Sequence, residues 1–116
     1  MATQKCEKKY EPTLSEQVTR LVLKAASSAD YSVEHIASEL CLSVRTFNRH
    51  LKKETGLAPK VFILTLQMQK AKHLLLQDRQ IHVSAIAVVC GFEDASSFSH
   101  TFKRMCGVNP TKYREE

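Results

Sequence analysis

The chain has 116 residues, of which 43% are hydrophobic and 25% charged, and its formal net charge is +5, with a pI of about 9.1. This composition excludes a disordered protein, and no run approaches the roughly 18 apolar residues of a membrane-spanning helix. A small basic domain is attracted to polyanions, although many membrane-surface and ordinary globular proteins are also basic.

The first twelve residues are polar and have no hydrophobic period, so we expect a tail or linker and not a signal peptide, which needs an apolar core. Thr13 is predicted to begin the first helix, because Thr13 and Glu16 have the spacing of a capping box. Apolar residues follow at helical spacing, and this helix is expected to end near Ser27–Asp30.

Two shorter helices are predicted next. One begins after Ser32 and ends near Leu42, and the other begins after Ser43 and ends near Thr55. Gly56 is a suitable end for the second helix, because glycine adopts the left-handed conformation at little cost.

A longer helix is predicted over residues 59–77, with Pro59 in its first turn, where a helix tolerates proline. Residues 60–76 of it would be roughly 25 Å long. The helix is expected to face a core, and about two heptads are too few to indicate a coiled coil. Its apolar stripe consists of Val61, Leu64, Met68, Ala71 and Leu75.

The last part of the chain predicts three further helices after the polar segment 78–80. The first begins at Ser84, the second begins after its N-cap Asp94 and ends at Gly107, and the third spans about 109–113. Seven helices and no strand are therefore predicted, which is an all-α fold. The residues expected to face inward on the first two of these helices are Ile86, Ala87, Val89, Ala95, Phe98, Phe102 and Met105.

The main signal in the sequence is an internal repeat, in which residues 83–107 follow the plan of residues 32–55. Each copy has a short helix, a tight turn, a polar N-cap and a second helix with an apolar stripe, which is the plan of a helix-turn-helix motif. The equivalent positions are Ile36-Ala37 and Ile86-Ala87, Cys41-Leu42 and Gly91-Phe92, Ser43 and Asp94, and Val44/Phe47/Leu51 and Ala95/Phe98/Phe102.

The opposite face of each second helix is polar and contains no acidic residue. Arginine can make two hydrogen bonds to guanine, asparagine can make two to adenine, and lysine suits phosphate. A solvated face would look similar on one helix, but two repeat-related faces favour DNA. The long helix could hold the two faces about one DNA turn apart, near 34 Å. The stripes are Arg45, Asn48, Arg49 and Lys52 in the first copy, and Ser96, Ser99, His100 and Lys103 in the second.

Residues 32–114 resemble the DNA-binding domain of the AraC/XylS family of bacterial transcription regulators. The second copy carries the most specific string of this resemblance, GFEDASSFSHTFKRMCGVNPTKYR. The first copy and the middle of the chain match at Ile36-Ala37, Ser43, Phe47, Arg49, Leu51-Lys52, Thr55-Gly56, Pro59, Ala71 and Leu74-Leu75.

The resemblance implies an AraC-type domain over residues 13–116, with a first helix-turn-helix unit at 13–57, a linker helix at 59–77 and a second unit at 81–116. It implies a sequence-specific transcription regulator that is not an enzyme, needs no metal or cofactor, and inserts two recognition helices into successive major grooves. Its expected partners are double-stranded DNA and RNA polymerase in the cytoplasm, with no membrane contact. The implied base contacts are Arg45, Asn48, Arg49, Ser96, Ser99 and His100, with Thr46, Lys52, Ser97 and Lys103 as supporting or phosphate contacts.

Three positions depart from the family pattern. Cys41 stands where the first turn often has glycine, so a different backbone is expected there. Gln67 stands where the linker helix often has arginine, so an anchoring ion pair is expected to be missing. His100 replaces a common arginine, and a neutral histidine cannot make the two-bond guanine contact. The first unit is therefore expected to recognise sequence more strongly than the second.

Family members usually carry a second domain for ligand sensing or dimerisation, for which 116 residues leave no room. The chain is expected to be either a short regulator or, by preference, a C-terminal fragment. The pattern also resembles the output domains of hybrid two-component sensors.

Other functions have weaker support in the sequence. The four cysteines, Cys6, Cys41, Cys90 and Cys106, have irregular spacing and no C-x-x-C pair, so reduced thiols are expected and no zinc pattern emerges. No nucleophile with an oriented base is visible. A helical module that binds a protein or RNA through its basic faces stays open, and competition by random duplex DNA would distinguish it.

Overall fold

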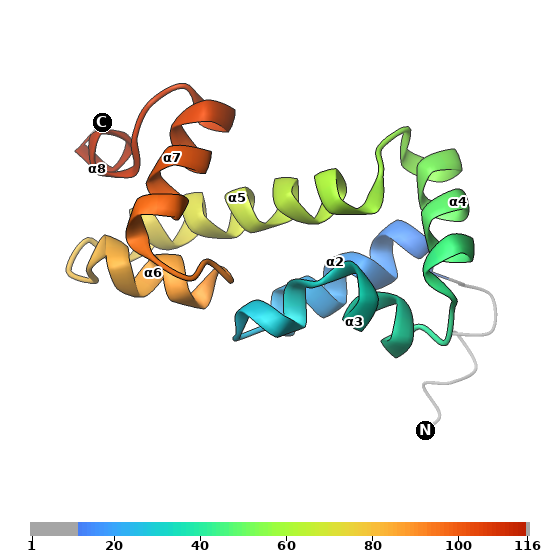
Figure 1. The fold of residues 1–116 in the computed structure, drawn as a ribbon. Helices are drawn as coiled ribbons and strands as arrows, with labels where there is room; N and C mark the ends of the chain where they lie inside the picture. Colours follow the sequence, from blue (N-terminus) through green and yellow to red (C-terminus); the bar gives the residue numbers. More distant parts are fainter. Residues whose placement is uncertain (1–11, 116) are drawn as a thin grey trace, which may run out of the picture.

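The computed structural model describes residues 12–115, which form seven α-helices and one 3₁₀ helix and contain no strand (Figure 1). The predicted all-α fold is confirmed, while the predicted tail lies almost entirely outside the described residues. The elements are α2 (Leu14–Lys24), η1 (Ser28–Tyr31), α3 (Val33–Glu39), α4 (Val44–Thr55), α5 (Pro59–Gln77), α6 (Val83–Val89), α7 (Ala95–Cys106) and α8 (Pro110–Glu115).

The long helix α5 runs through the middle of the molecule, with α2, α3 and α4 around one half and α6, α7 and α8 around the other (Figure 1). The buried side chains form two separate clusters, one in each half. Helix α5 contributes to both clusters, with Ile63 in the first and Met68, Ala71 and Leu75 in the second. The two halves are thus distinct cores that share one helix.

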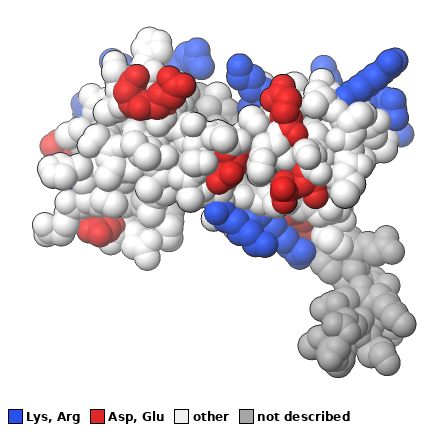
Figure 2. All heavy atoms as spheres, turned by 60° about the horizontal axis from the view of Figure 1, so that its bottom comes forward, with Lys and Arg blue, Asp and Glu red and all other residues white. Residues whose placement is uncertain are grey.

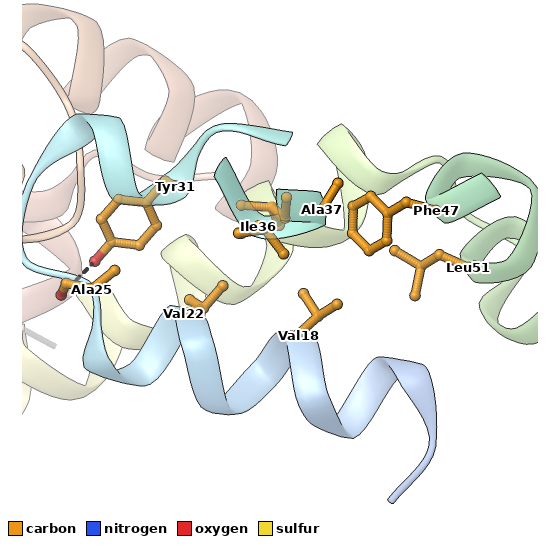
Figure 3. Close-up of a cluster of buried hydrophobic side chains, with 9 residues drawn as sticks. Val18, Val22, Ala25, Tyr31, Ile36, Ala37, Phe47 and Leu51 are labelled. Atoms are coloured by element: carbon orange, nitrogen blue, oxygen red, sulfur yellow. Dashed lines mark hydrogen bonds between the residues drawn. The ribbon is translucent and has the colours of Figure 1, made fainter. Parts of the chain in front are cut away.

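The first core lies between α2, α3, α4 and the start of α5. Phe47 and Leu51, one helical turn apart on α4, are fully buried and point toward Val18 of α2 and toward α3, where Ile36 is also fully buried (Figure 3). Burial of such a side chain stabilises the fold by about 1.5–3 kcal/mol. The inner face of α4 therefore fixes which face of this helix points to solvent.

The second core is organised by aromatic rings. The ring centroids of Phe92 and Phe98 lie 5.4 Å apart, those of Phe98 and Phe102 5.7 Å, and those of Phe102 and Tyr113 5.5 Å. Tilted and edge-to-face pairs of this kind add about 0.5–1.5 kcal/mol to the burial of the rings. They hold α7 between the turn that precedes it and α8.

Four residues that were predicted to face inward are instead substantially exposed. Val44, Val61, Val89 and Met105 have exposed fractions of 39%, 46%, 37% and 39%. Each lies in the first or last turn of its helix, where the neighbouring elements no longer cover it. Helical periodicity identifies a face but not how far along the helix that face is covered.

The predicted start of α2 is confirmed and its predicted end is wrong. The Thr13 hydroxyl accepts from the Glu16 amide at 3.2 Å, and the Glu16 carboxylate accepts from the Thr13 amide at 3.0 Å, which forms the capping box. The helix ends at Lys24. Beyond it the Ala26 amide donates to the Asp30 carboxylate at 3.2 Å instead of to a helical carbonyl oxygen. Such side-chain bonds offer the backbone an alternative to the helix.

Helix α6 begins one residue earlier than predicted, at Val83, with His82 as its N-cap. Its position relative to α5 is fixed by Arg114 on α8. The guanidinium donates to the carbonyl oxygens of Leu75 at 3.0 Å, Ile81 at 2.7 Å and Asp78 at 3.2 Å. Two of these oxygens belong to residues at the carboxyl end of α5, where carbonyls have no partner within the helix.

Candidate nucleic-acid interface

The turns inside the two repeat copies have equivalent backbone hydrogen bonds. The amide after Cys41 donates to the Ala37 carbonyl oxygen at 2.9 Å, and the amide after Gly91 donates to the Ala87 carbonyl oxygen at 2.9 Å. Cys41 and Gly91 themselves have φ values of 60° and 94°. The backbone at Cys41 lies in the same left-handed region as that at Gly91, with a φ that is 34° smaller (94° − 60°), and an exposed cysteine adopts this conformation at a cost that glycine avoids.

Helices α4 and α7 match each other closely. Each has 12 residues, and each ends at a glycine with positive φ, 81° at Gly56 and 88° at Gly107. The amide of each glycine closes its helix by donating to a carbonyl oxygen four residues earlier, at 2.7 Å for Lys52 and 2.9 Å for Lys103. The internal repeat thus extends to both ends of the second helix.

Both of these helices begin at a residue whose side chain caps the first turn. The Ser43 hydroxyl accepts from the Thr46 amide at 3.1 Å, and the Asp94 carboxylate accepts from the Ser97 amide at 2.7 Å. The bond from the Ser97 amide is the main reason that the pKa of Asp94 lies below its ordinary value. The Thr46 hydroxyl lies 3.0 Å from that of Ser43, so it is engaged inside the cap.

The outer face of α4 brings the predicted contact residues of the first unit together. Arg45, Asn48, Arg49 and Lys52 are all exposed, and with Lys53 they line one shallow hollow. Figure 2 shows Lys and Arg side chains gathered at the upper right, over the side of the molecule where α4 lies in Figure 1. The acidic side chains of this view lie nearer its centre and its left.

The outer face of α7 is less charged. Ser96, Ser97, His100 and Lys103 are exposed, and Ser99 is half-buried. This face can donate and accept hydrogen bonds from short side chains, but its only full charge among these residues is that of Lys103. The expectation that the first unit recognises sequence more strongly than the second stays a prediction.

No carboxylate of residues 12–115 forms an ion pair with the basic side chains on either face. Within the described residues, the one ion pair is that between His35 and Asp30, at 3.8 Å. The positive charges on α4 and α7 are therefore not neutralised by carboxylates of residues 12–115, and they are available to an anionic ligand.

Two basic residues of these surfaces were not among the predicted contacts. Lys53 lines the hollow on α4, and Arg104 is exposed in the last turn of α7. Both follow a predicted lysine directly in sequence. The spacing of three and four residues selects a narrow stripe, whereas long basic side chains reach around the helix from adjacent positions.

Other kinds of site find no support in residues 12–115. No three His, Cys, Asp or Glu side chains among them lie close enough together to hold a metal ion. No helix in this part of the chain is long and apolar enough to cross a bilayer.

Comparison with known proteins identifies the relatives of this chain. A family model described as a helix-turn-helix domain matches residues 36–116. The transcriptional activator RhaS of Escherichia fergusonii is 42% identical over 84 residues, which cover 72% of this chain and 30% of RhaS. RhaS of Escherichia coli is 34% identical over 110 residues, or 39% of its length, so the chain spans well under half of these curated relatives.

Solved structures show the same fold. The DNA-binding domain of AdpA, crystallised in complex with a target DNA, has a TM-score of 0.78 and 28% identity and covers 90% of this chain and 92% of that one. The C-terminal domain of the two-component response regulator YesN from Fusobacterium nucleatum has a TM-score of 0.75 and 28% identity, over 85% and 95%. The repeat, the paired basic helices and these matches show that the chain belongs to the AraC/XylS family of DNA-binding transcription regulators, which are not enzymes.

Proposed function

We propose that residues 13–116 act as the DNA-binding output domain of a regulator that controls transcription initiation, with α4 and α7 entering successive major grooves. The observation that carries this proposal is the pair of matched helices, each with a buried inner face and an exposed outer face without acidic residues. A helix of this kind fits the width of a major groove. The complex of the similar AdpA domain with its target DNA supports the same use of the fold.

The residues of α4 have distinct proposed roles. Arg45, Asn48 and Arg49 contact bases, because their side chains can each make two hydrogen bonds to one base edge. Lys52, one turn after Asn48, contacts phosphate and fixes the register of the helix on the duplex. Thr46 supports this surface by accepting a hydrogen bond from the hydroxyl of the N-cap Ser43.

The residues of α7 make a weaker set of contacts. In this proposal the base edges are contacted by Ser96, Ser99 and His100. The phosphate backbone of the DNA is contacted by Ser97 and Lys103. Short hydroxyl side chains discriminate less between bases than a two-bond arginine or asparagine contact does. We therefore infer that α4 specifies the site and that α7 adds affinity with lower selectivity.

Selection from random duplexes of roughly 25 bp, about two helical turns, tests the function as a whole. Two enriched boxes about one turn apart are expected. One box would assign base recognition to α4 alone, and the absence of any salt-sensitive binding would favour a protein or RNA partner instead.

Two substitutions on α4 then test the proposed roles. Arg49→Ala should weaken binding to the selected site by about 1–3 kcal/mol and to random DNA much less. Lys52→Ala should weaken both similarly and lower the slope of log K against log salt by about one. Arg20→Ala on α2, where the side chain is exposed, removes the same charge outside the two recognition helices and serves as the control. Equal losses for Arg49→Ala on both DNAs would contradict base contact.

We infer further that this domain works in the bacterial cytoplasm with RNA polymerase and with a sensing or dimerisation domain. This inference is supported by the RhaS chains, of which the matched region makes up only 30–39%. A second neighbour type, the response regulator YesN, is consistent with control by a two-component system.

A further inference from the structure

Three polar side chains join the two units at the middle of α5. The Tyr31 hydroxyl donates to the carbonyl oxygen of Val89 at 2.8 Å, and Gln67 Nε2 donates to that of Cys90 at 2.8 Å. Lys70 Nζ donates to the Tyr31 hydroxyl at 2.7 Å. We call Tyr31, Gln67 and Lys70 the junction clasp. It connects η1 of the first unit, the linker helix and the end of α6 in the second unit.

The carbonyl groups that the clasp holds lie at helix ends. Val89 is the last residue of α6 and Cys90 its C-cap, so neither oxygen has a partner further along that helix. On the other side, Lys70 Nζ donates to the carbonyl oxygen of Ala25 at 2.8 Å, and Ala25 is the C-cap of α2. The clasp therefore satisfies the ends of one helix from each unit, and a cation suits such an end.

The shorter bonds form a directed chain from the ammonium of Lys70 through the Tyr31 hydroxyl to Val89. The other acceptor near this hydroxyl, the Ala25 carbonyl oxygen, lies farther away, at 3.3 Å (Figure 3). A hydroxyl that accepts from a cation becomes a better donor, so the two bonds strengthen each other. Burial raises the pKa of Tyr31 well above its ordinary value, which keeps the hydroxyl proton in place as the donor. Gln67 is only 8% exposed and Tyr31 6%, so water competes little for these bonds.

Gly91 shows how closely the second unit is held. A Cβ atom at this position would lie 2.7 Å from Cε2 of Tyr31 and 2.9 Å from Nε2 of Gln67. The equivalent turn residue of the first unit, Cys41, is exposed and carries a side chain. The neutral amide of Gln67 makes no ion pair among the described residues, in line with the expectation for this position, but it anchors α5 to this turn by a hydrogen bond.

The clasp lies just before the recognition helix of the second unit. The clasp bonds to Val89 and Cys90, where the turn after α6 begins. This turn ends at Asp94, the N-cap of α7, only four residues after Cys90. Helix α5 is the one element that contributes buried apolar residues to both cores, so apart from this helix no apolar cluster connects α7 to α4 within the described residues. The clasp supplies bonds across this junction that the cores do not.

We propose that the junction clasp sets the distance and angle between α4 and α7, and so makes the protein select DNA sites by the spacing of their two boxes. The inference rests on the proposed function, since it concerns how the two recognition helices act together. One inserted base pair shifts a box by about 3.4 Å and rotates it by about 35° around the duplex axis. A rigid pair of helices cannot follow both changes, whereas a loosened pair can.

The test compares Tyr31→Phe/Lys70→Met with the matched control Tyr113→Phe/Lys72→Met, which makes the same chemical changes outside the clasp. Binding is measured on the selected site and on sites with one base pair added or removed between the boxes. We expect the wild type and the control to lose about tenfold in affinity on the altered spacings, and the clasp variant to lose about two- to threefold. Similar spacing profiles for all three proteins would overturn the proposal.

A measurement without DNA separates this inference from the proposed function. Spin labels at positions 50 and 104, attached through unnatural amino acids so that the cysteines stay native, report the distance between α4 and α7. A narrow distance distribution is expected for wild type and control, and a broader one for the clasp variant with unchanged circular dichroism. An unchanged distribution would overturn the clasp even if DNA binding is confirmed. A broadened distribution without specific DNA binding would contradict the proposed function alone.

Discussion

Replacing Gly91 with alanine should cost more stability than the same change at Gly107, although the two glycines have nearly the same backbone. Their φ values are 94° and 88°. A side chain in the left-handed region costs about 1–2 kcal/mol at either position. A Cβ atom at Gly107 meets nothing within 4 Å, whereas at Gly91 it collides with the ring of Tyr31 and the amide of Gln67.

The size of the difference follows from the bonds that must be given up. Tyr31 and Gln67 are nearly buried, so they can move away from a new methyl group only by leaving the carbonyl oxygens of Val89 and Cys90. The loss of each bond costs about 1 kcal/mol. Gly91→Ala should therefore lower the free energy of unfolding by about 3–4 kcal/mol in total, against about 1–2 kcal/mol for Gly107→Ala.

Urea unfolding followed by far-ultraviolet circular dichroism measures both values, by linear extrapolation to water. Gly56→Ala provides a second reference, because its φ is 81° and a Cβ there also meets nothing within 4 Å. Equal losses at Gly91 and at the two reference positions would refute the reasoning, since they would show that the contacts of Tyr31 and Gln67 adjust without cost.

Two further predictions concern single ionisable groups. The pKa of Asp94 is lowered in the folded state, so the carboxylate stabilises the protein above its ordinary pKa of 3.8 and loses this effect as the pH falls through the lowered value. The unfolding free energy of the wild type should fall relative to that of Asp94→Asn over this acid range, and a constant difference would contradict the prediction. Burial raises the pKa of Cys90 to about 11. A thiol reagent at pH ~8 should therefore label the exposed Cys41 before the buried Cys90, and mass spectrometry of the labelled protein measures the order. Equally rapid labelling of Cys41 and Cys90 would contradict the prediction that Cys90 is buried and protonated.

Features that depend on neighbouring residues could be predicted from the sequence. The capping box of Thr13 and Glu16 needs only a spacing of three, and the outer faces of α4 and α7 follow from helical period and the repeat. The exposure of Val61 could not be predicted in the same way. The buried side of α5 belongs first to one core and then to the other, so a single stripe does not describe it.

The junction clasp was beyond the reach of sequence patterns for a similar reason. Tyr31 and Val89 are 58 residues apart, and Lys70 lies 39 residues from Tyr31. No local period links such positions, and only the packed arrangement shows that the side-chain amide of Gln67 donates a hydrogen bond to the Cys90 carbonyl oxygen. Sequence patterns are limited in the same way for the proposed DNA-contact residues. The helical period places these residues on one face, but the bases that they recognise depend on the DNA site.

The sharing of α5 between two cores has a consequence for how the protein unfolds. Loss of either unit would leave one side of α5 uncovered, with Ile63 exposed in one case and Met68, Ala71 and Leu75 in the other. The chain therefore resembles a two-member repeat array, whose stability is the sum of two intrinsic terms and one coupling term. Native-state hydrogen exchange should divide its amides into two cooperative groups, with those of α5 protected as long as either group remains closed.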